Sequence, residues 1–431
     1  MPCLALVTLF SNVLGRNHSE GRSGAAVRGI APPGEHFASH SQERVMTLRV
    51  RCGRFPSSAK VSIVDYQNVG SAQVTSLSEL VGGWRAELPD LVLHDPDGPT
   101  ECLVRSGELV VFPEDLPRAV DRLGRWVDRV DEPTALGMAR IRLRPRERAQ
   151  CVLIAHDHGY APNHVHLGSP IMIGTAEPVA SAAAPVEPPR VECWDVTAAV
   201  LDTGLDPHPW FAGRAWFAEH GHSPEVLDAD GRDGQDRQAG HGTFVAGVLL
   251  QHAPGVAIRH HRVLSSLGLT DDFTVATGLH SLGGVDVVLL TAGCHTADDR
   301  CPPVLRRELA AFPSSVVVAA AGNGGTSRPL WPAALPDVLA VGADAAFSNH
   351  GPWVDATAPG VDVVSSHVRL RPSPGSAPGT ETREYGYARW SGTSFAAPRV
   401  AALVARLLRD GRTPAQARDE AARLFSPTRS S

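Results

Sequence analysis

Three short motifs in the second half of the chain carry side chains that can act together in nucleophilic catalysis. V-L-D-T-G contains Asp202, G-H-G-T-F-V-A-G contains His241, and S-G-T-S-F-A-A-P contains Ser394. A serine hydroxyl is a poor nucleophile unless an adjacent base removes its proton. Histidine can act as that base near neutral pH, while a carboxylate orients the imidazole and stabilises its charged form. These residue types therefore predict attack by Ser394, with His241 as general base and Asp202 as its partner.

The surroundings of each residue fit these roles to different degrees. Asp202 follows an apolar run, at the carboxyl end of a predicted strand, where sites form in open α/β sheets. D-T-G alone is a weak signal, because aspartic proteases and simple turns use it too. His241 stands between two glycines ahead of an apolar, helix-like run. Ser394 is expected at the start of a buried helix, where free N–H groups favour a developing anion.

The elements that must position these residues form an alternating pattern. After residue 190, continuous apolar runs typical of buried strands are separated by helical stretches. The runs occupy residues 198–201, 285–290, 316–320 and 338–341. Such a pattern predicts an α/β fold whose parallel sheet has helices on both faces.

The chain order Asp, His, Ser of these motifs resembles the subtilisin family. A fourth motif, A-A-A-G-N-G at 319–324, is similar to the segment that supplies the oxyanion hole in that family. By this resemblance Asn323 donates its side-chain amide to the tetrahedral oxyanion, and losing such a donor costs about 2.7–4 kcal/mol of barrier. The alternative is a Gly-Asn-Gly turn. The resemblance covers roughly residues 195–410 and implies a subtilisin-like serine endopeptidase.

The same resemblance assigns a substrate-binding segment. Thr291, Ala292 and Gly293 follow the apolar run 285–290, where relatives commonly have Ser-Leu-Gly. That segment implies backbone pairing with an extended peptide substrate. The alanine in place of leucine alters the wall of the pocket for the residue before the cleaved bond, but not the backbone pairing.

An earlier module, residues 106–175, has its own pattern. Strands are predicted at 108–112 and 139–144 and near 164–167, with helices at 116–130 and 151–155. This order predicts a small α+β module of the β-α-β-β-α-β type. It resembles a subtilisin propeptide, which implies help in folding and intramolecular inhibition by occupation of the active site. The alternative is an accessory domain that packs on the peptidase without inhibiting it.

The remaining segments set the domain boundaries. Residues 1–60 lack a sustained pattern and are predicted to be disordered, and residues 61–105 have no assigned role. Residues 176–190 are rich in proline and alanine and are predicted to be a linker. The peptidase domain is predicted at 191–425.

The composition limits which partners and which cellular compartment are expected. The formal net charge of -6 gives no reason to expect nucleic acid, and no apolar stretch is long enough for a membrane anchor. Seven scattered cysteines favour free thiols in a reducing compartment, with local pairing of Cys294 and Cys301 as the alternative. A cytoplasmic location is favoured, although the apolar N-terminus leaves secretion open. The expected partners are peptide or protein substrates and the chain's own N-terminal module.

No cofactor and no metal ion is expected for this chemistry. The acidic loop 228–236 lacks the twelfth-position glutamate of an EF-hand, because Ala239 stands there. Three histidine pairs are interpreted as surface or turn residues: His156 with His158, His164 with His166, and His260 with His261. Two other functions compete with the endopeptidase: an inactive scaffold used for binding, and an esterase or peptide ligase on the same triad.

Overall fold

The structure is a computed structural model that describes residues 77–85, 88–131, 138–168, 178–219, 222–229, 234–371 and 382–426. All of these residues belong to one compact unit, Gly70–Ser431. The disorder predicted for 1–60 lies outside the described residues. Among the described helices, none is both long and apolar enough to cross a membrane.

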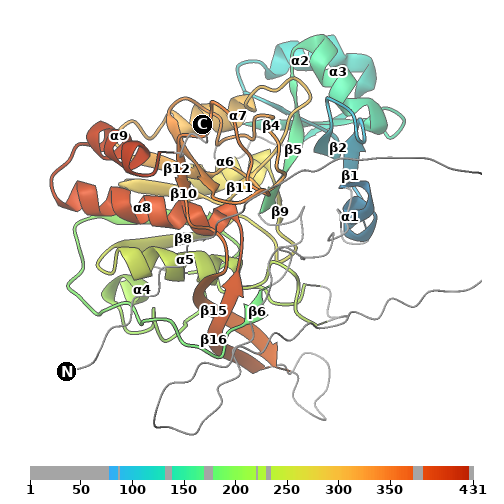
Figure 1. Ribbon diagram of the computed structural model, residues 1–431. Coiled ribbons are helices and arrows are strands. Elements are labelled where there is room, and N and C mark those ends of the chain that lie inside the picture. Colours follow the sequence, from blue (N-terminus) through green and yellow to red (C-terminus); the bar gives the residue numbers. More distant parts are fainter. Residues whose placement is uncertain are drawn as a thin grey trace, which may run out of the picture. The chain divides into compact units, whose positions relative to one another are not determined.

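A six-stranded sheet forms the centre of the second half of the chain (Figure 1). Its order is β14-β13-β12-β10-β7-β8, and every neighbouring pair is parallel. The strands are β7 (Thr197–Asp202), β8 (Ala257–Arg262), β10 (Val287–Leu290), β12 (Val316–Ala320), β13 (Val338–Ala343) and β14 (Ala356–Ala358). The predicted parallel sheet is confirmed. The run predicted from residue 285 begins its strand two residues later.

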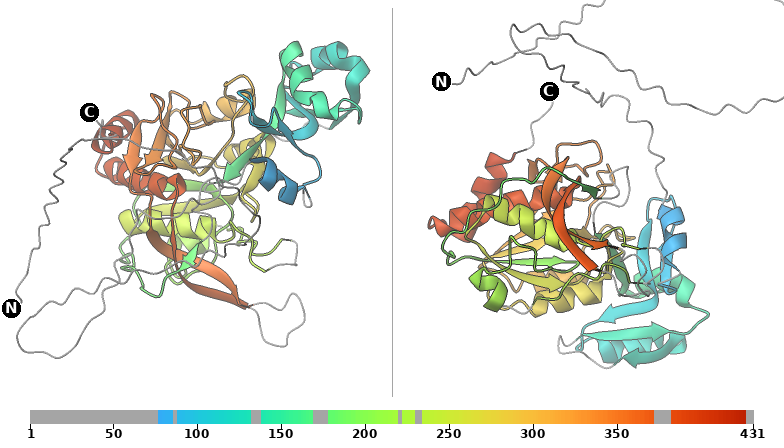
Figure 2. Two further views of the ribbon diagram at one scale, coloured as in Figure 1. Left: turned by 45° about the vertical axis from the view of Figure 1, so that its right-hand side comes forward. Right: turned by 90° about the horizontal axis from the view of Figure 1, so that it is seen from below.

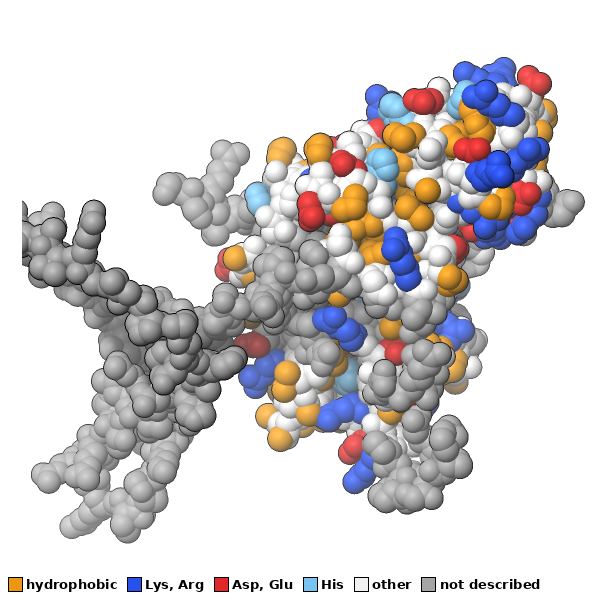
Figure 3. Space-filling model, turned by 90° about the vertical axis from the view of Figure 1, so that its right-hand side faces the viewer, with side chains coloured by type: hydrophobic (Ala, Val, Ile, Leu, Met, Phe, Trp, Pro, Cys, Tyr) orange, Lys and Arg blue, Asp and Glu red, His pale blue; other side chains and the backbone are white. Residues whose placement is uncertain are grey.

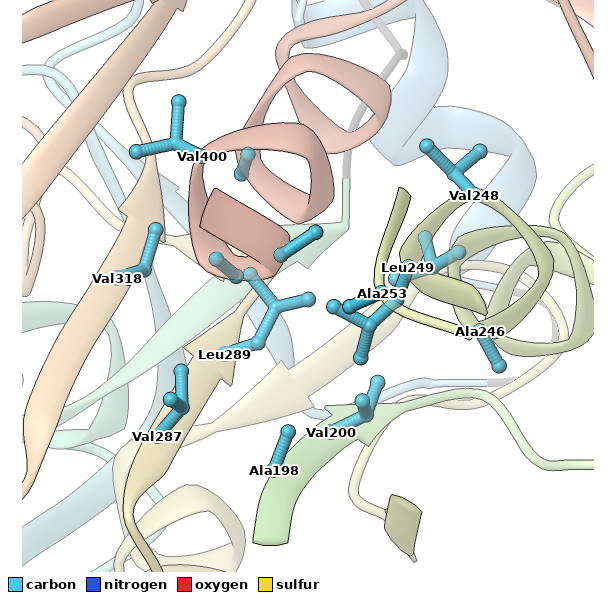
Figure 4. Close-up of a cluster of buried hydrophobic side chains, with 14 of the residues drawn as sticks. Ala198, Val200, Ala246, Val248, Leu249, Ala253, Val287, Leu289, Val318 and Val400 are labelled. Carbon is cyan, nitrogen blue, oxygen red and sulfur yellow. The ribbon is translucent and has the colours of Figure 1, made fainter. Parts of the chain in front are cut away.

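Helices cover both faces of this sheet because successive strand residues point to opposite sides. Ala198 and Val200 of β7 face a core with α5 (His241–His252) and α8 (Thr393–Arg409), as Figure 4 shows. Their neighbours Ala199 and Leu201 face a second core, with α6 (Asp272–His280) and α7 (Pro303–Leu309). The helix predicted to begin near Ser394 is confirmed in α8.

Peripheral elements extend the central domain. The helices α4 (Ala215–Glu219) and α9 (Pro414–Leu424) pack beside the first core. The antiparallel strands β15 (Val363–Arg371) and β16 (Thr382–Trp390) form a long hairpin that projects from the domain (Figure 2). The short strand β6 (Val179–Ala180) pairs with β16, so part of the segment predicted as a linker is bound to the peptidase domain.

The N-terminal module forms an antiparallel sheet with three helices, and its described elements begin at residue 77, ahead of the predicted start at 106. Its elements are α1 (Leu77–Trp84), β1 (Leu91–His94), β2 (Cys102–Val111), α2 (Leu116–Leu123), β3 (Val127–Asp131), β4 (Ala139–Leu143), α3 (Cys151–His158) and β5 (Ala161–Gly168). The order β5-β2-β4-β3 agrees with the predicted β-α-β-β-α-β pattern. Basic and acidic side chains lie close together on the outer surface of this module (Figure 3).

The helix predicted at 116–130 is wrong in its second half. The helix ends at Leu123, a single 3-10 turn follows at Gly124–Trp126, and the chain then extends as β3. Val127 and Val130 have helical spacing from Leu123, but they pair with β4 instead. Strand pairing thus outweighs the local periodicity, because β-branched side chains suit a pleated sheet better than a helix.

Strand β5 pairs with strands of both the N-terminal module and the peptidase domain. Its first residues pair with β2 of the module, and its last residues pair with two short strands of the peptidase domain. Those partners are β9 (Leu269–Asp271) and β11 (Ala292–Gly293), one on each side of β5. The module's sheet therefore continues into the peptidase domain through one shared strand.

Candidate active site

Three of the predicted site residues lie at the same edge of the central sheet. Asp202 ends β7, Thr291 follows β10, and Asn323 lies three residues after β12. Because β12, β10 and β7 are neighbours in a parallel sheet, their carboxyl ends lie side by side. The sheet topology therefore brings together residues that are far apart in the sequence.

His241 reaches this edge as the first residue of α5. The preceding Gly240 has a φ of +85°, which glycine adopts readily, and this conformation turns the chain into the helix. Gly242 lies against the carbonyl oxygen of Gly204 in the D-T-G turn, where a Cβ atom would collide. Gly240 thus allows the turn into the helix, and Gly242 allows the helix start and the Asp202 turn to approach each other closely.

Asp202 and His241 form a buried hydrogen-bonded pair. Nδ1 of His241 lies 2.7 Å from Oδ1 of Asp202, and the backbone N–H of Thr203 donates to the same oxygen at 2.7 Å. The hydroxyl of Thr291 donates to Oδ2 of Asp202 at 2.5 Å. Burial alone would raise the pKa of Asp202, but His241 and the Thr291 hydroxyl lower it below its ordinary value. The carboxylate is therefore held in its charged form.

Ser394 approaches the pair from α8 as the helix's second residue. Its hydroxyl donates to the carbonyl oxygen of Thr291 at 3.3 Å. The His241 ring packs against Phe395, which follows Ser394, with 5.2 Å between ring centroids. Nε2 of His241 is buried and has no hydrogen-bond partner among the described residues. This nitrogen is the atom that a general base would use, because Nδ1 is already engaged by Asp202.

Asn323 presents a donor to the same region. Its Oδ1 accepts the backbone N–H of Thr393 at 2.9 Å, which fixes the orientation of the side-chain amide. Nδ2 is buried, and none of the residues that the structure describes accepts a hydrogen bond from it. A buried donor without an acceptor is costly unless a ligand supplies one.

The predicted substrate-binding segment is occupied by the chain itself. Ala292 pairs with Gly168 and Gly293 with Leu167, both from the end of β5. On the other side of β5, the backbone N–H of Gly168 donates to the carbonyl oxygen of Gly268 at 2.7 Å. A cavity of about 340 Å³ lies beside this segment, and its lining includes Thr291, Gly293, Asn323, Leu330 and Leu167.

The surface or turn positions predicted for the histidine pairs are wrong for three residues. His164 and His166 are buried in β5, and His260 is buried in β8, whereas His156 is exposed. Both β5 histidines bind Asp272, a buried residue that sequence spacing did not indicate. Residues 230–233 of the acidic loop lie outside the described residues. Cys294 and Cys301 are both free thiols.

Glu225 is a second titratable group that sequence reasoning missed. It is fully buried, and its Oε1 accepts the backbone N–H of Thr243 at 2.9 Å and that residue's hydroxyl at 3.1 Å. Burial, together with the charges of Asp202 and Asp206, raises its pKa to about 8. Glu225 is therefore protonated at neutral pH beneath the helix that carries His241.

Comparison with known proteins identifies the family to which this chain belongs. The model of the subtilase family matches residues 195–423, more than half of the chain. The chain therefore belongs to the subtilase family of serine peptidases, and its predicted resemblance is confirmed.

Individual relatives match the second half of the chain. The thermophilic serine proteinase of Bacillus sp. (strain AK1) is 34% identical over 249 residues, covering 51% of this chain and 55% of the relative. Subtilisin BL of Lederbergia lenta is 32% identical, covering 49% of this chain and 75% of the relative. The chain spans about half the length of the first of these. Fervidolysin from Fervidobacterium pennivorans, a keratinolytic enzyme, has a TM-score of 0.49 at 20% identity, covering 73% of this chain and 57% of that one.

Proposed function

We propose that the chain is a serine endopeptidase that hydrolyses peptide bonds through an acyl-enzyme on Ser394. The main support is the 2.7 Å hydrogen bond between Nδ1 of His241 and Oδ1 of Asp202. It leaves Nε2 as the ring nitrogen with no partner among the described side chains, next to the helix that carries Ser394. A charged carboxylate behind an imidazole with a free nitrogen is the arrangement that general-base catalysis needs.

The proposed reaction has two stages. The Ser394 hydroxyl turns from the Thr291 carbonyl to Nε2 of His241, which takes its proton as Oγ bonds to the substrate's carbonyl carbon. Nδ2 of Asn323 and the backbone N–H of Ser394 stabilise the oxyanion. His241 gives the proton to the leaving amine as the C–N bond breaks. Water, deprotonated by the same imidazole, then hydrolyses the ester and restores the serine.

The substrate would bind as a single extended strand between β9 and β11. The support is that β5 already pairs with β11 on one side and with β9 on the other. Backbone hydrogen bonds give such a groove affinity for any extended peptide, while side-chain pockets give it preference. Thr291, Ala292 and Gly293 would pair with the substrate next to the cleaved bond.

The N-terminal module would then act as an intramolecular inhibitor. Its strand β5 fills the strand position that the substrate needs, so the two cannot bind together. The side chains of Asp202, His241 and Ser394 are also fully buried in the intact chain. Activity would therefore require β5 to leave, either by cleavage after β5 or by displacement.

Intact-mass spectrometry with a fluorophosphonate probe tests both parts of this proposal. Wild-type protein and Ser394→Ala are incubated with the probe, which reacts with an activated serine. We expect the wild type to gain the probe mass and to lose an N-terminal piece that ends within residues 165–195. The Ser394→Ala protein should do neither.

Each other outcome has a defined meaning. Probe addition without loss of the N-terminal piece would support the triad and argue against self-processing. A wild type that never gains the probe mass, even in mild denaturant that frees β5 from the groove, would contradict the endopeptidase and favour an inactive scaffold. Matched ester and peptide substrates then separate an endopeptidase from an esterase or ligase, because only the endopeptidase turns over the peptide efficiently.

A further inference from the structure

Two histidines of β5 converge on one buried carboxylate of the peptidase domain. His164 and His166 share a face of the strand because alternate strand residues point the same way. Nδ1 of His164 lies 2.9 Å from Oδ2 of Asp272, and Nε2 of His166 lies 2.8 Å from Oδ1. Asp272 is the first residue of α6. This cluster therefore joins the N-terminal module to the peptidase domain in the interior.

A thiol completes this cluster. One ring nitrogen of His166, one carboxylate oxygen of Asp272 and Sγ of Cys294 all lie within 4.8 Å of one another. The exposed fractions of the three residues are 0%, 1% and 3%. Nδ1 of His166 is buried, and within the described part of the chain it has no hydrogen-bond partner. Nε2 is the ring nitrogen that faces Asp272, at 2.8 Å from Oδ1, so it is the nitrogen that an ion shared with that carboxylate would use.

We propose that His166, Asp272 and Cys294 bind one thiophilic divalent cation, best matched by zinc, which fastens β5 to the peptidase domain. A set of one nitrogen, one oxygen and one sulfur suits zinc, whereas calcium and magnesium prefer oxygen alone. Tetrahedral zinc holds such atoms about 3.3–3.6 Å apart, given its bond lengths of about 2.0–2.3 Å. The three ligand atoms lie within 4.8 Å of one another, so side-chain adjustments would bring them to this spacing.

The groups around these ligands favour a dication. His164 donates its backbone N–H to Oδ2 of Asp272 at 2.9 Å, so the carboxylate is oriented by a neighbour that is not itself a ligand. The Cys294 thiol would give up its proton to solvent as the ion binds, because the thiolate is the form that binds zinc. Two negative charges then neutralise the ion within the buried site.

The consequence of the site concerns the release of β5. Two ligands belong to the peptidase domain and one to the module, so the ion must lose a ligand before the strand can leave. The proposal that these residues bind an ion does not depend on the proposed function. The effect on the release of β5 does depend on it, because it assumes that the module inhibits the peptidase. We therefore test the two with separate measurements.

Cobalt is the probe for the site, because a thiolate bound to Co²⁺ gives a charge-transfer band in the near ultraviolet. The protein is the untagged full chain carrying Ser394→Ala, which cannot cut itself, freed of metal with a chelator. We expect the band to saturate at one ion per chain and to vanish when Zn²⁺ displaces Co²⁺. Calcium and magnesium should leave the band unchanged. Absence of the band in this protein would overturn the proposal.

Variants in the same background identify the ligands. Cys294→Ser should abolish the band, and His166→Gln and Asp272→Asn should each weaken cobalt binding by tenfold or more. The matched control is Cys301→Ser, because Cys301 is also buried but its thiol donates to the carbonyl oxygen of Pro302. A band that survives in Cys294→Ser, or disappears in Cys301→Ser, contradicts the assignment. Thermal unfolding without metal shows which variants fold. If Cys294→Ser does not fold, the loss of cobalt binding in His166→Gln tests the assignment instead.

The effect of the ion on the release of β5 is measured in protein that keeps Ser394. We expect fluorophosphonate labelling of the full chain to be at least tenfold slower with saturating Zn²⁺ than with a chelator. Cys294→Ser should label at one rate in both conditions, which excludes inhibition through His241. If cobalt binds but zinc leaves the rate unchanged, the fastening role is wrong. If the chain never labels, the proposed peptidase fails while the cobalt result still decides the metal site.

Discussion

Thr291 is the residue that connects both halves of the candidate catalytic apparatus. Its hydroxyl donates to Oδ2 of Asp202, and its carbonyl oxygen accepts the hydroxyl of Ser394. The sequence predicted Thr291 only as a backbone partner for substrate. Residue spacing cannot reveal the second role, because it depends on the direction of one hydroxyl at the end of β10.

Removing only that hydroxyl tests its contribution. Thr291→Val keeps the shape of the side chain but leaves Oδ2 of Asp202 without its donor, so the pKa of Asp202 should rise. A hydrogen bond to a charged group contributes about 1.5–3 kcal/mol, so kcat should fall by about tenfold or more. Thr291→Ser restores the hydroxyl and should recover most of the activity. Equal loss in both variants would show that packing, and not the hydrogen bond, is responsible.

Asn323 should act only in the transition state. Asn323→Ala is expected to lower kcat by about 10²–10³-fold with little change in KM, because the oxyanion loses one donor. Asn323→Asp keeps an acceptor for the Thr393 N–H but removes the donor. It therefore separates the role of Asn323 in catalysis from its hydrogen bond to the start of α8. Steady-state kinetics on a peptide substrate measure both. Full activity of the Asp variant would rule out the oxyanion role.

Glu225 should make stability depend on pH. Its pKa of about 8 lies above the ordinary value of 4.5, so the folded state holds a proton that the unfolded state releases first. The resulting stability is complete below about pH 4.5 and is lost as pH rises toward 8. Glu225→Gln cannot ionise and should be more stable than wild type at pH 8 by a few kcal/mol. Parallel unfolding curves at pH 5 and pH 8 measure this, and an unchanged difference between the two proteins would contradict it.

At the scale of elements, the contact between α5 and the D-T-G turn holds His241 beside Asp202. A Cβ atom at Gly242 would meet the Gly204 carbonyl oxygen and the His260 ring. Gly242→Ala should therefore destabilise the protein by about 1–3 kcal/mol and reduce activity, because α5 must shift. Gly284→Ala is the control, since a Cβ there meets nothing within 4 Å. Thermal unfolding and kcat are measured for both, and equal effects would refute the close contact.

The sequence predicted those elements whose signal is local. The apolar runs of β7, β12 and β13 are long enough to predict strands, and the glycines beside His241 indicated a close approach. The helix at 116–130 was overextended, because helical spacing from Leu123 to Val127 and Val130 also fits a strand when a partner strand is present. β9 has three residues and β11 has two, so neither has a pattern of its own.

At the scale of the whole molecule, side chains as well as β5 hold the module to the peptidase domain. Arg105 of β2 donates to Asp271 at 2.9 Å, and both side chains are mostly buried. Arg328 donates to the carbonyl oxygen of Glu101 in the module at 2.6 Å. Asp271 and Asp272 thus serve the module from adjacent positions, and sequence reasoning missed both because their partners lie more than a hundred residues earlier.

Loosening this contact should release the module sooner. Arg105→Ala removes a charged hydrogen bond and should raise the rate of fluorophosphonate labelling of the intact chain by about tenfold. Arg129→Ala is the control, because Arg129 is exposed and pairs with Asp131 inside the module. Equal rates in wild type and Arg105→Ala would show that β5 alone limits release.

The position of β5 between β9 and β11 also determines what kind of target the groove can admit. Neighbouring strands lie about 4.8 Å apart, so the space between the two edges is one strand wide. An α-helix is too broad for that space, and a strand already paired in a sheet has no free edges to offer. A folded target must therefore open locally before it is cut. Its rate of cleavage would follow the free energy of that opening, so the groove would select targets by their local stability as well as by their side chains.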